Sequence, residues 1–196
     1  QAPTSYKIIK LARDNEGNIL AIDGTLKVMK FDYFQWSTVN NGLVQLDYYK
    51  YNYNFFSSSL GKIAFGSRYD WRDKVAVYNI NTNSYELNIN GPGYSSYPPY
   101  PFFRGGDLYV FEYSGDSDHD GYPYIFKYQN GAWYQVWKGP VLYKPGNSYA
   151  AYYNQTNDDL VVAFENRSNS NSVYRYKFSD NSWSGIGTVE YPKHSI

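Results

Sequence analysis

Four stretches of this chain end in nearly the same way, and the spacing between them is nearly constant. In each, an apolar run leads into a short polar turn and an aromatic residue follows; the stretches are residues 26–36, 75–85, 124–133 and 173–183. The closing aromatic residues are Trp36, Tyr85, Trp133 and Trp183, at steps of 49, 48 and 50 residues. A period of this length is typical of stacked or radial repeats. The repeat constrains the architecture more than any other feature of the sequence.

Each repeat holds four strand-like segments. Apolar runs precede the closing hairpins at residues 17–22, 61–65, 106–111 and 158–164, and looser aromatic runs precede those at residues 6–9, 53–56, 100–103 and 149–153. Runs of this length bounded by Gly, Pro, Asn, Asp and Ser predict β-strands. Asn130-Gly131 predicts a tight hairpin, because both residues tolerate positive φ angles. We call the four strands of a repeat a, b, c and d, in chain order.

Four antiparallel strands per repeat predict an all-β chain folded as a small β-propeller of four four-stranded blades. We expect a single domain over residues 1–196, with blades at roughly residues 5–40, 41–90, 91–139 and 140–190. A β-barrel or a β-sandwich built from the same strands is the alternative.

Two of the repeats resemble the kelch repeat, the blade type of galactose oxidase and related propellers. In the third repeat, Arg104-Gly105-Gly106 and the following strand are similar to the family's double glycine and the strand after it. Residues 124–128 with Trp133, and residues 173–176 with Trp183, are similar to its later Tyr and Trp positions. The resemblance implies kelch-like propeller blades. It does not carry over the copper site of galactose oxidase, because that site has no counterpart that can be placed in this chain, which also lacks Cys.

Composition argues against several classes of function. The 18 basic and 18 acidic residues balance, so no charge excess favours nucleic acid or an anionic membrane. No apolar run is long enough to span a bilayer. Cysteine is absent, and neither His119 nor His194 is placed like the buried, oriented histidine of a catalytic triad. We therefore expect a protein that is not an enzyme, with no nucleic-acid partner and no membrane span.

Two features predict a secreted, extracellular glycoprotein. The chain begins Gln-Ala-Pro-Thr-Ser, which is typical of a terminus left after removal of a signal peptide, although a trimmed chain would read the same. Glycosylation sequons begin at Asn154 and Asn166.

The strand directions predict which loops share a face. Because strands alternate, the b–c loops and d–a links open on one face, and the a–b and c–d turns open on the other. Long b–c loops are expected at residues 67–73, 114–121 and 165–172. Long loops on a rigid scaffold often carry function, so we place the binding face on the b–c side.

The loop over residues 67–73 has the composition of a carbohydrate site. Aromatic rings stack on the apolar face of a sugar, while charged side chains make strong hydrogen bonds to its hydroxyls. The predicted ligand-binding residues from the b–c loops are Arg68, Tyr69, Asp70, Trp71, Arg72, Asp73, His119, Asn166 and Arg167. Alternatively, Trp71 packs over a blade edge and the charges pair on the surface.

The d–a link before the third repeat adds Tyr94, Tyr97 and Tyr100 to the predicted ligand-binding residues. Together with Pro98 and Pro99 they would form a rigid aromatic wall, because proline limits the backbone entropy lost on binding. Ordinary packing between blades is the alternative.

Residues 116–121 are the sharpest local motif. Oxygen ligands at alternate positions followed by Gly121 are the opening of a calcium loop. The predicted ligands are Asp116, Asp118, Asp120 and the carbonyl of Tyr122, with Ca²⁺ ordering the loop. The twelfth position is Lys127 where an EF-hand has Glu, and a solvated acidic hairpin is the alternative.

These features favour a carbohydrate-binding, lectin-like protein whose partner is a saccharide or glycoconjugate. One alternative is a matrix or adhesion protein that binds other proteins or a cell wall through Tyr-rich segments such as residues 48–53. Another is a small polysaccharide hydrolase with a carboxylate pair drawn from Asp70, Asp73, Glu112 and Glu165.

Overall fold

The computed structural model describes residues 8–13, 18–23, 28–31, 34–38, 55–59, 61–69, 72–79, 81–82, 84–93, 97–115, 120–142, 149–165 and 170–190. Regular secondary structure in these ranges is entirely β-strand. No helix in this part of the chain is long and apolar enough to cross a membrane.

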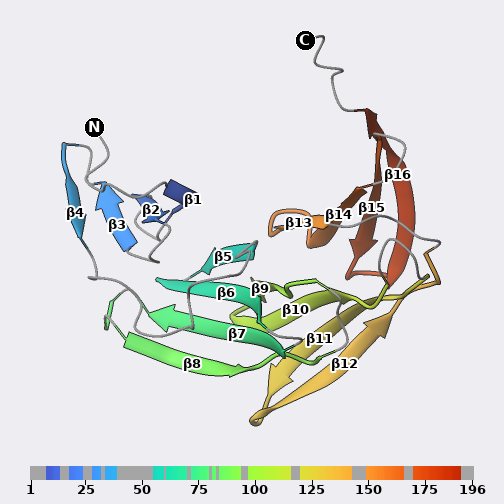
Figure 1. The fold of residues 1–196 in the computed structure, drawn as a ribbon, viewed down its shortest axis with the longest axis horizontal. Helices are drawn as coiled ribbons and strands as arrows, with labels where there is room; N and C mark the ends of the chain where they lie inside the picture. The colour runs from blue at the N-terminus through green and yellow to red at the C-terminus, as the bar shows by residue number, and fades with distance from the viewer. Residues whose placement is uncertain are drawn as a thin grey trace.

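The strands form four four-stranded antiparallel sheets, each a simple meander in chain order (Figure 1). The first sheet contains β1 (Ile8–Arg13), β2 (Ile19–Asp23), β3 (Val28–Phe31) and β4 (Trp36–Thr38). The second contains β5 (Phe55–Ser59), β6 (Lys62–Tyr69), β7 (Arg72–Asn79) and β8 (Ser84–Asn90). The third contains β9 (Tyr100–Arg104), β10 (Asp107–Tyr113), β11 (Pro123–Gln129) and β12 (Ala132–Lys138). The fourth contains β13 (Tyr149–Asn154), β14 (Asp159–Glu165), β15 (Ser170–Lys177) and β16 (Ser182–Glu190).

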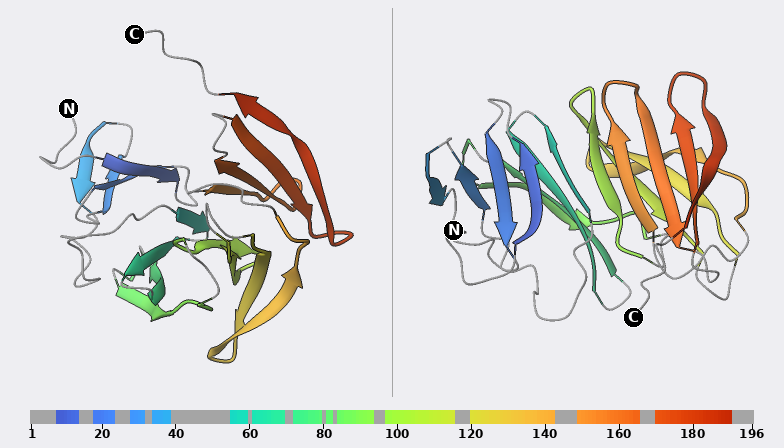
Figure 2. Two further views of the ribbon diagram at one scale, coloured as in Figure 1. Left: turned by 45° about the vertical axis from the view of Figure 1, so that its right-hand side comes forward. Right: turned by 90° about the horizontal axis from the view of Figure 1, so that it is seen from above.

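The sheets follow one another around an arc. Figure 1 shows β5, β9 and β13 toward the middle and β8, β12 and β16 on the outside, so strand a of these sheets is innermost and strand d outermost. Figure 2 shows the same succession of separate sheets from two other directions. Separate four-stranded units set around an arc distinguish this structure from a barrel or a sandwich of the same strands.

The sequence repeat has a direct structural cause. Each closing aromatic residue on strand d lies opposite an aromatic residue on strand c, across the hairpin that joins them. The four cross-strand pairs are Phe31–Trp36, Tyr78–Tyr85, Tyr128–Trp133 and Tyr176–Trp183. Directly opposed aromatic residues stabilise an antiparallel ladder. The predicted turn at Asn130-Gly131 is confirmed, with φ angles of 51° and 83°.

The apolar core lies between neighbouring sheets. Between the second and third sheets it is mostly aliphatic and includes Ala64, Val75, Val77, Leu108 and Val110. Between the third and fourth sheets it is mainly aromatic. Its buried aromatic residues are Tyr100, Phe102, Tyr109, Phe111, Tyr113, Tyr149, Phe164 and Tyr176. Aromatic side chains bury large areas, so a few of them fill the space between two sheets.

Backbone hydrogen bonds confirm that b–c and d–a connections share a face. Gly91 in a d–a link donates its N–H to the carbonyl of Asp73 at 2.8 Å, at the start of strand c. In the third repeat, Gly121 of the b–c connection and Leu142 of the d–a link exchange two such bonds, at 3.2 and 2.8 Å.

The prediction of a long loop over residues 67–73 is wrong, because the strands on both sides extend into it. Strand β6 continues to Tyr69, β7 begins at Arg72, and the ladder pairs Arg68 with Asp73 and Tyr69 with Arg72. The fourth repeat is similar, because Glu165 pairs with Asn171 inside the expected loop over residues 165–172. Polar residues do not end these strands, because a ladder uses backbone groups and leaves the side chains free to be polar.

Candidate functional site

Four of the residues predicted from the loop at 67–73 lie in strands, and the structure does not test their role in binding. Arg68, Tyr69 and Arg72 lie on the final rungs of the β6–β7 ladder. Asp73 is buried, with 4% of its surface exposed. Several other predicted residues lie outside the described ranges, and the predictions for them stay predictions: Asp70, Trp71, Tyr94, His119, Asn166 and Arg167.

The Tyr-rich link was considered either as a ligand-binding wall or as packing between blades. Tyr100 packs between the sheets. This residue is 5% exposed, its ring lies 5.8 Å from that of Phe102, and its hydroxyl accepts a hydrogen bond from the N–H of Tyr153 at 3.0 Å. Burial raises the pKa of Tyr100 to about 12. Tyr97 is half-buried and meets Tyr149 edge-on at 6.1 Å.

The predicted calcium loop is described only at its end. Asp116 and Asp118 lie outside the described residues, and Asp120 is exposed. The carbonyl of Tyr122 accepts hydrogen bonds from Ser114, at 3.1 Å from its N–H and 3.4 Å from its hydroxyl. Within the described ranges, no three His, Cys, Asp or Glu side chains group so as to hold a metal ion. Calcium binding stays a prediction.

Two of the carboxylates considered for hydrolysis come together in the structure. A Cβ placed on Gly91 would lie 2.8 Å from Cβ of Asp73 and 3.4 Å from Oε1 of Glu112. Burial raises the pKa of the nearby Tyr149 well above its usual value, and the negative charges of Glu112 and Asp73 raise it further. Glu112 is fully buried and Asp73 nearly so. Neither carboxylate therefore contacts an external polysaccharide unless the surrounding segments move.

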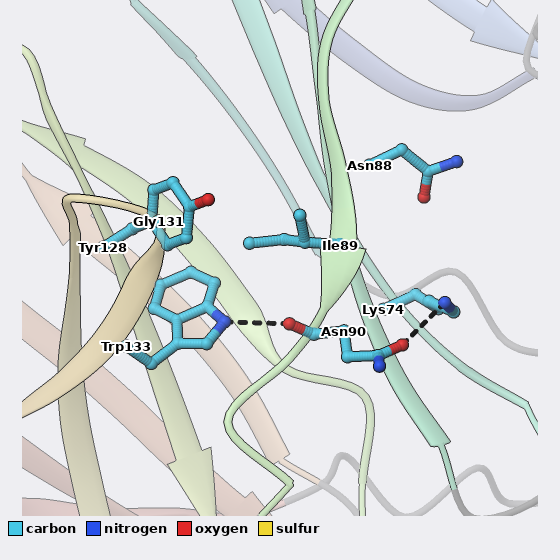
Figure 3. A pocket seen from close by; sticks show the side chains of 7 residues that line it. All are labelled: Lys74, Asn88, Ile89, Asn90, Tyr128, Gly131 and Trp133. Atoms are coloured by element: carbon cyan, nitrogen blue, oxygen red, sulfur yellow. Dashed lines mark hydrogen bonds between the residues drawn. The ribbon is translucent and has the colours of Figure 1, made fainter.

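A cleft of about 440 Å³ lies between the outer strands of the second and third sheets, and the sequence-based predictions did not include it. Its volume falls within the range typical of small-molecule sites. The residues that line it are Lys74, Asn88, Ile89, Asn90, Tyr128, Gly131 and Trp133 (Figure 3).

One side of the cleft is aromatic. Tyr128 and Trp133 face each other across the β11–β12 hairpin, with ring centroids 5.0 Å apart and planes at 58°. Figure 3 shows the side chain of Ile89 pointing toward both rings. All three side chains are half-buried and pack against the core between the two sheets. The rings are therefore held in place and keep part of their surface exposed to the cleft.

The other side of the cleft is polar and is joined to the aromatic side through Asn90. The indole N–H of Trp133 donates to the carbonyl of Asn90 at 2.8 Å, and Nζ of Lys74 donates to its Oδ1 at 2.7 Å (Figure 3). Asn88 and Asn90 are exposed. Lys74 is the only charged residue among the described residues of the lining. The arrangement offers rigid aromatic surface beside amide and ammonium donors.

One side chain explains why this cleft is open while the equivalent space at the next interface is filled. Ile89 lies opposite Val75 in the second sheet, and Trp137 lies opposite Ile125 at the equivalent rung of the third. Trp137 extends toward the fourth sheet, where its ring contacts those of Tyr176 at 4.5 Å and Trp183 at 5.3 Å.

The two hairpin tryptophans differ accordingly. Among the described residues the buried indole nitrogen of Trp183 has no hydrogen-bond partner, whereas that of Trp133 is bonded to Asn90. The smaller Ile89 leaves space beside Trp133.

The sequence contained a signal for this cleft that alignment of the repeats would expose. Trp133 closes the third repeat, and the Asn130-Gly131 turn before it predicts a hairpin and nothing about a site. The informative comparison is at a single position of strand d, where the second repeat has Ile89 and the third repeat has Trp137.

Comparison with known proteins gives a fold and no family. No known family profile matches the sequence, and no curated protein matches it. Among solved structures, TolB from Acinetobacter baumannii superposes with a TM-score of 0.60 at 10% identity, over 95% of this chain and 45% of that one. The SapL1 lectin in complex with alpha methyl fucoside gives 0.58 at 12% identity, over 95% and 64%. The β-propeller domain of Myceliophteria thermophila Cps50 (Swd1) gives 0.51 at 10% identity, over 97% and 63%.

These similarities, together with the four sheets around an arc, show that the chain has a β-propeller fold. They do not distinguish a kelch-like blade from other blade types, so the kelch assignment stays a prediction. The chain spans about half to two thirds of the length of these three structures.

Proposed function

We propose that this protein binds carbohydrate in the cleft between its second and third sheets. The observation that carries the proposal is the half-buried pair of Tyr128 and Trp133, fixed by the core and set beside amide and ammonium donors. The apolar face of a sugar ring stacks on an aromatic ring, and its hydroxyls need hydrogen-bond partners nearby.

The cleft replaces the b–c face as the proposed site, and the ligand class predicted from the sequence is kept. The similarity to the SapL1 lectin supports the same ligand class at the level of fold. The proposal includes the extracellular location that the sequence predicts.

The alternatives are less well supported by the described residues. A hydrolase built on Asp73 and Glu112 would need substrate access to two buried carboxylates. A protein-binding role needs a broad contact surface, whereas this aromatic pair lies in a cleft of small-molecule size.

The test is calorimetric titration of a saccharide panel with wild-type protein and the Trp133→Ala variant. We expect at least one saccharide to bind and Trp133→Ala to weaken it by at least about tenfold, as loss of a central aromatic contact typically does. Trp133→Phe keeps a ring and loses the N–H donated to Asn90, so it should weaken binding only a few-fold, for a hydrogen bond worth about 1 kcal/mol.

Two matched controls separate loss of the site from loss of the fold. Trp36→Ala removes the equivalent hairpin tryptophan of the first sheet and should leave binding unchanged. Ile89→Trp should fill the cleft and abolish binding, while Ile186→Trp adds the same ring at an exposed position of β16 and should not. Binding that survives both Trp133→Ala and Ile89→Trp would show that the site lies elsewhere.

A further inference from the structure

We infer that the saccharide bound by this cleft is acidic, carrying a negatively charged group that pairs with Lys74. This inference rests on the proposed function and adds the ligand's charge to it. Its basis is the charge of the lining, whose described residues include one cation and no carboxylate.

Lys74 differs in its partner from three described cations that form ion pairs. Lys62 pairs with Glu86 at 2.6 Å and Lys127 with Asp107 at 2.7 Å, so each is neutralised within its own sheet. Arg104 pairs with Asp158 at 2.7 Å. Within the described part of the chain, Lys74 has an amide oxygen as its partner in place of a carboxylate.

The hydrogen bond to Asn90 positions the ammonium group of Lys74 and uses only part of its donor capacity. A lysine ammonium has three donors, and one of them is directed at Oδ1 of Asn90. Two donors therefore remain for a ligand. Because Asn90 also receives the indole N–H of Trp133, the charge is held at a fixed place relative to the stacking ring.

A half-buried ammonium in a cleft interacts more strongly with an anion than a fully solvated one does. A charge-assisted hydrogen bond is stronger than a neutral one, and we expect an acidic sugar to bind about tenfold more tightly than its neutral parent. A carboxylate and a sulfate ester share this chemistry, so the probes must include both.

The experiment titrates the protein with glucose and galactose, with their uronic acids and with their 6-sulfates, at neutral pH. We expect the acidic sugars to bind about tenfold more tightly than the neutral ones, with the preference weakening as salt is added. The stronger of the two acidic series identifies the group.

Three variants decide whether Lys74 is responsible. Lys74→Met keeps the apolar stem and should remove the preference. Because the ammonium is also one of the donors beside the aromatic pair, neutral-sugar binding should weaken only a few-fold. Lys74→Arg should retain it, which also guards against misfolding as an explanation. Lys138→Met removes a lysine outside the cleft, whose ammonium lies over the ring of Tyr122, and should change nothing.

The outcomes separate the two proposals. Acidic and neutral sugars that bind equally well, both dependent on Trp133, would overturn this inference and leave the proposed function standing. A preference that persists in Lys74→Met would also overturn it. Absence of binding by every sugar in the panel would overturn the proposed function and this inference with it.

Discussion

At the scale of single residues, the connection between the third and fourth sheets depends on an ion pair at their a–b turns. Arg104 at the end of β9 donates from Nε and Nη2 to the two carboxylate oxygens of Asp158, each at 2.7 Å. The hydroxyl of Tyr153 donates to the same carboxylate at 2.7 Å, and the guanidinium lies 4.4 Å from the ring of Phe178. These contacts tie residues that are far apart in the sequence.

The ion pair makes stability depend on pH. The hydrogen bond from Arg104 lowers the pKa of Asp158 below its usual value of 3.8. A carboxyl group whose pKa is lower in the folded state stabilises the protein above its unfolded pKa, and that contribution disappears as the pH falls through the folded pKa. The stabilisation from Asp158 should thus be complete at pH 7 and lost below about pH 4.

Asp158→Asn tests this dependence without straining the backbone, because Asp158 has a φ of 51° and Asn tolerates positive φ. The side chains are 34% and 38% exposed, so solvent screens the pair and we expect a loss of about 1 kcal/mol at pH 7. Urea unfolding of wild type and variant at pH 7 and at pH 2 measures it. A difference that is as large at pH 2 as at pH 7 would contradict the role given to the charge.

At the scale of the strands, the repeat was readable from the sequence because each hairpin places an aromatic pair at the same rung. Such a pair can be predicted from one repeat alone, because both of its residues belong to the same hairpin. The predicted segments therefore overlap the observed strands, most closely in the third and fourth sheets.

Features that depend on contact between two sheets could not be predicted from the sequence in this way. Asp73 and Tyr100 were predicted as binding residues, yet both are buried. The carbonyl of Asp73 accepts the N–H of Gly91 from a d–a link, and the hydroxyl of Tyr100 accepts the N–H of Tyr153 from the next sheet. The cleft could not be predicted for the same reason: it depends on how Ile89 of the second sheet meets Tyr128 and Trp133 of the third, which a single repeat does not show.

Gly66 of β6 is a further residue whose role only the folded structure shows. A Cβ at this position would overlap the carbonyl oxygen of Pro99 and lie 2.9 Å from Cδ of Pro101, at the start of the third sheet. The absence of a side chain allows the second and third sheets to approach each other.

Gly66→Ala should therefore destabilise the protein by about 1–3 kcal/mol through overpacking. Gly185→Ala in β16 is the matched control, because its Cβ would have 3.8 Å to its nearest neighbour and should be tolerated. Thermal unfolding of the two variants measures the difference, and equal melting temperatures would contradict the close approach at Gly66.

At the scale of the whole molecule, the sheets are similar units whose interfaces differ. The interface between the third and fourth sheets is filled by aromatic rings, including Trp137. The interface between the second and third is aliphatic at its core and open at its outer edge, where the cleft lies. A repeating scaffold has in this way produced a distinctive site at one of its interfaces.

The most direct test of this account is a crystal structure of the protein with a bound acidic saccharide. We predict the sugar ring on Trp133, between β8 and the β11–β12 hairpin, with its negative group within hydrogen-bond distance of Nζ of Lys74. A sugar bound instead at the b–c and d–a connections, with an empty cleft beside Trp133, would contradict the account.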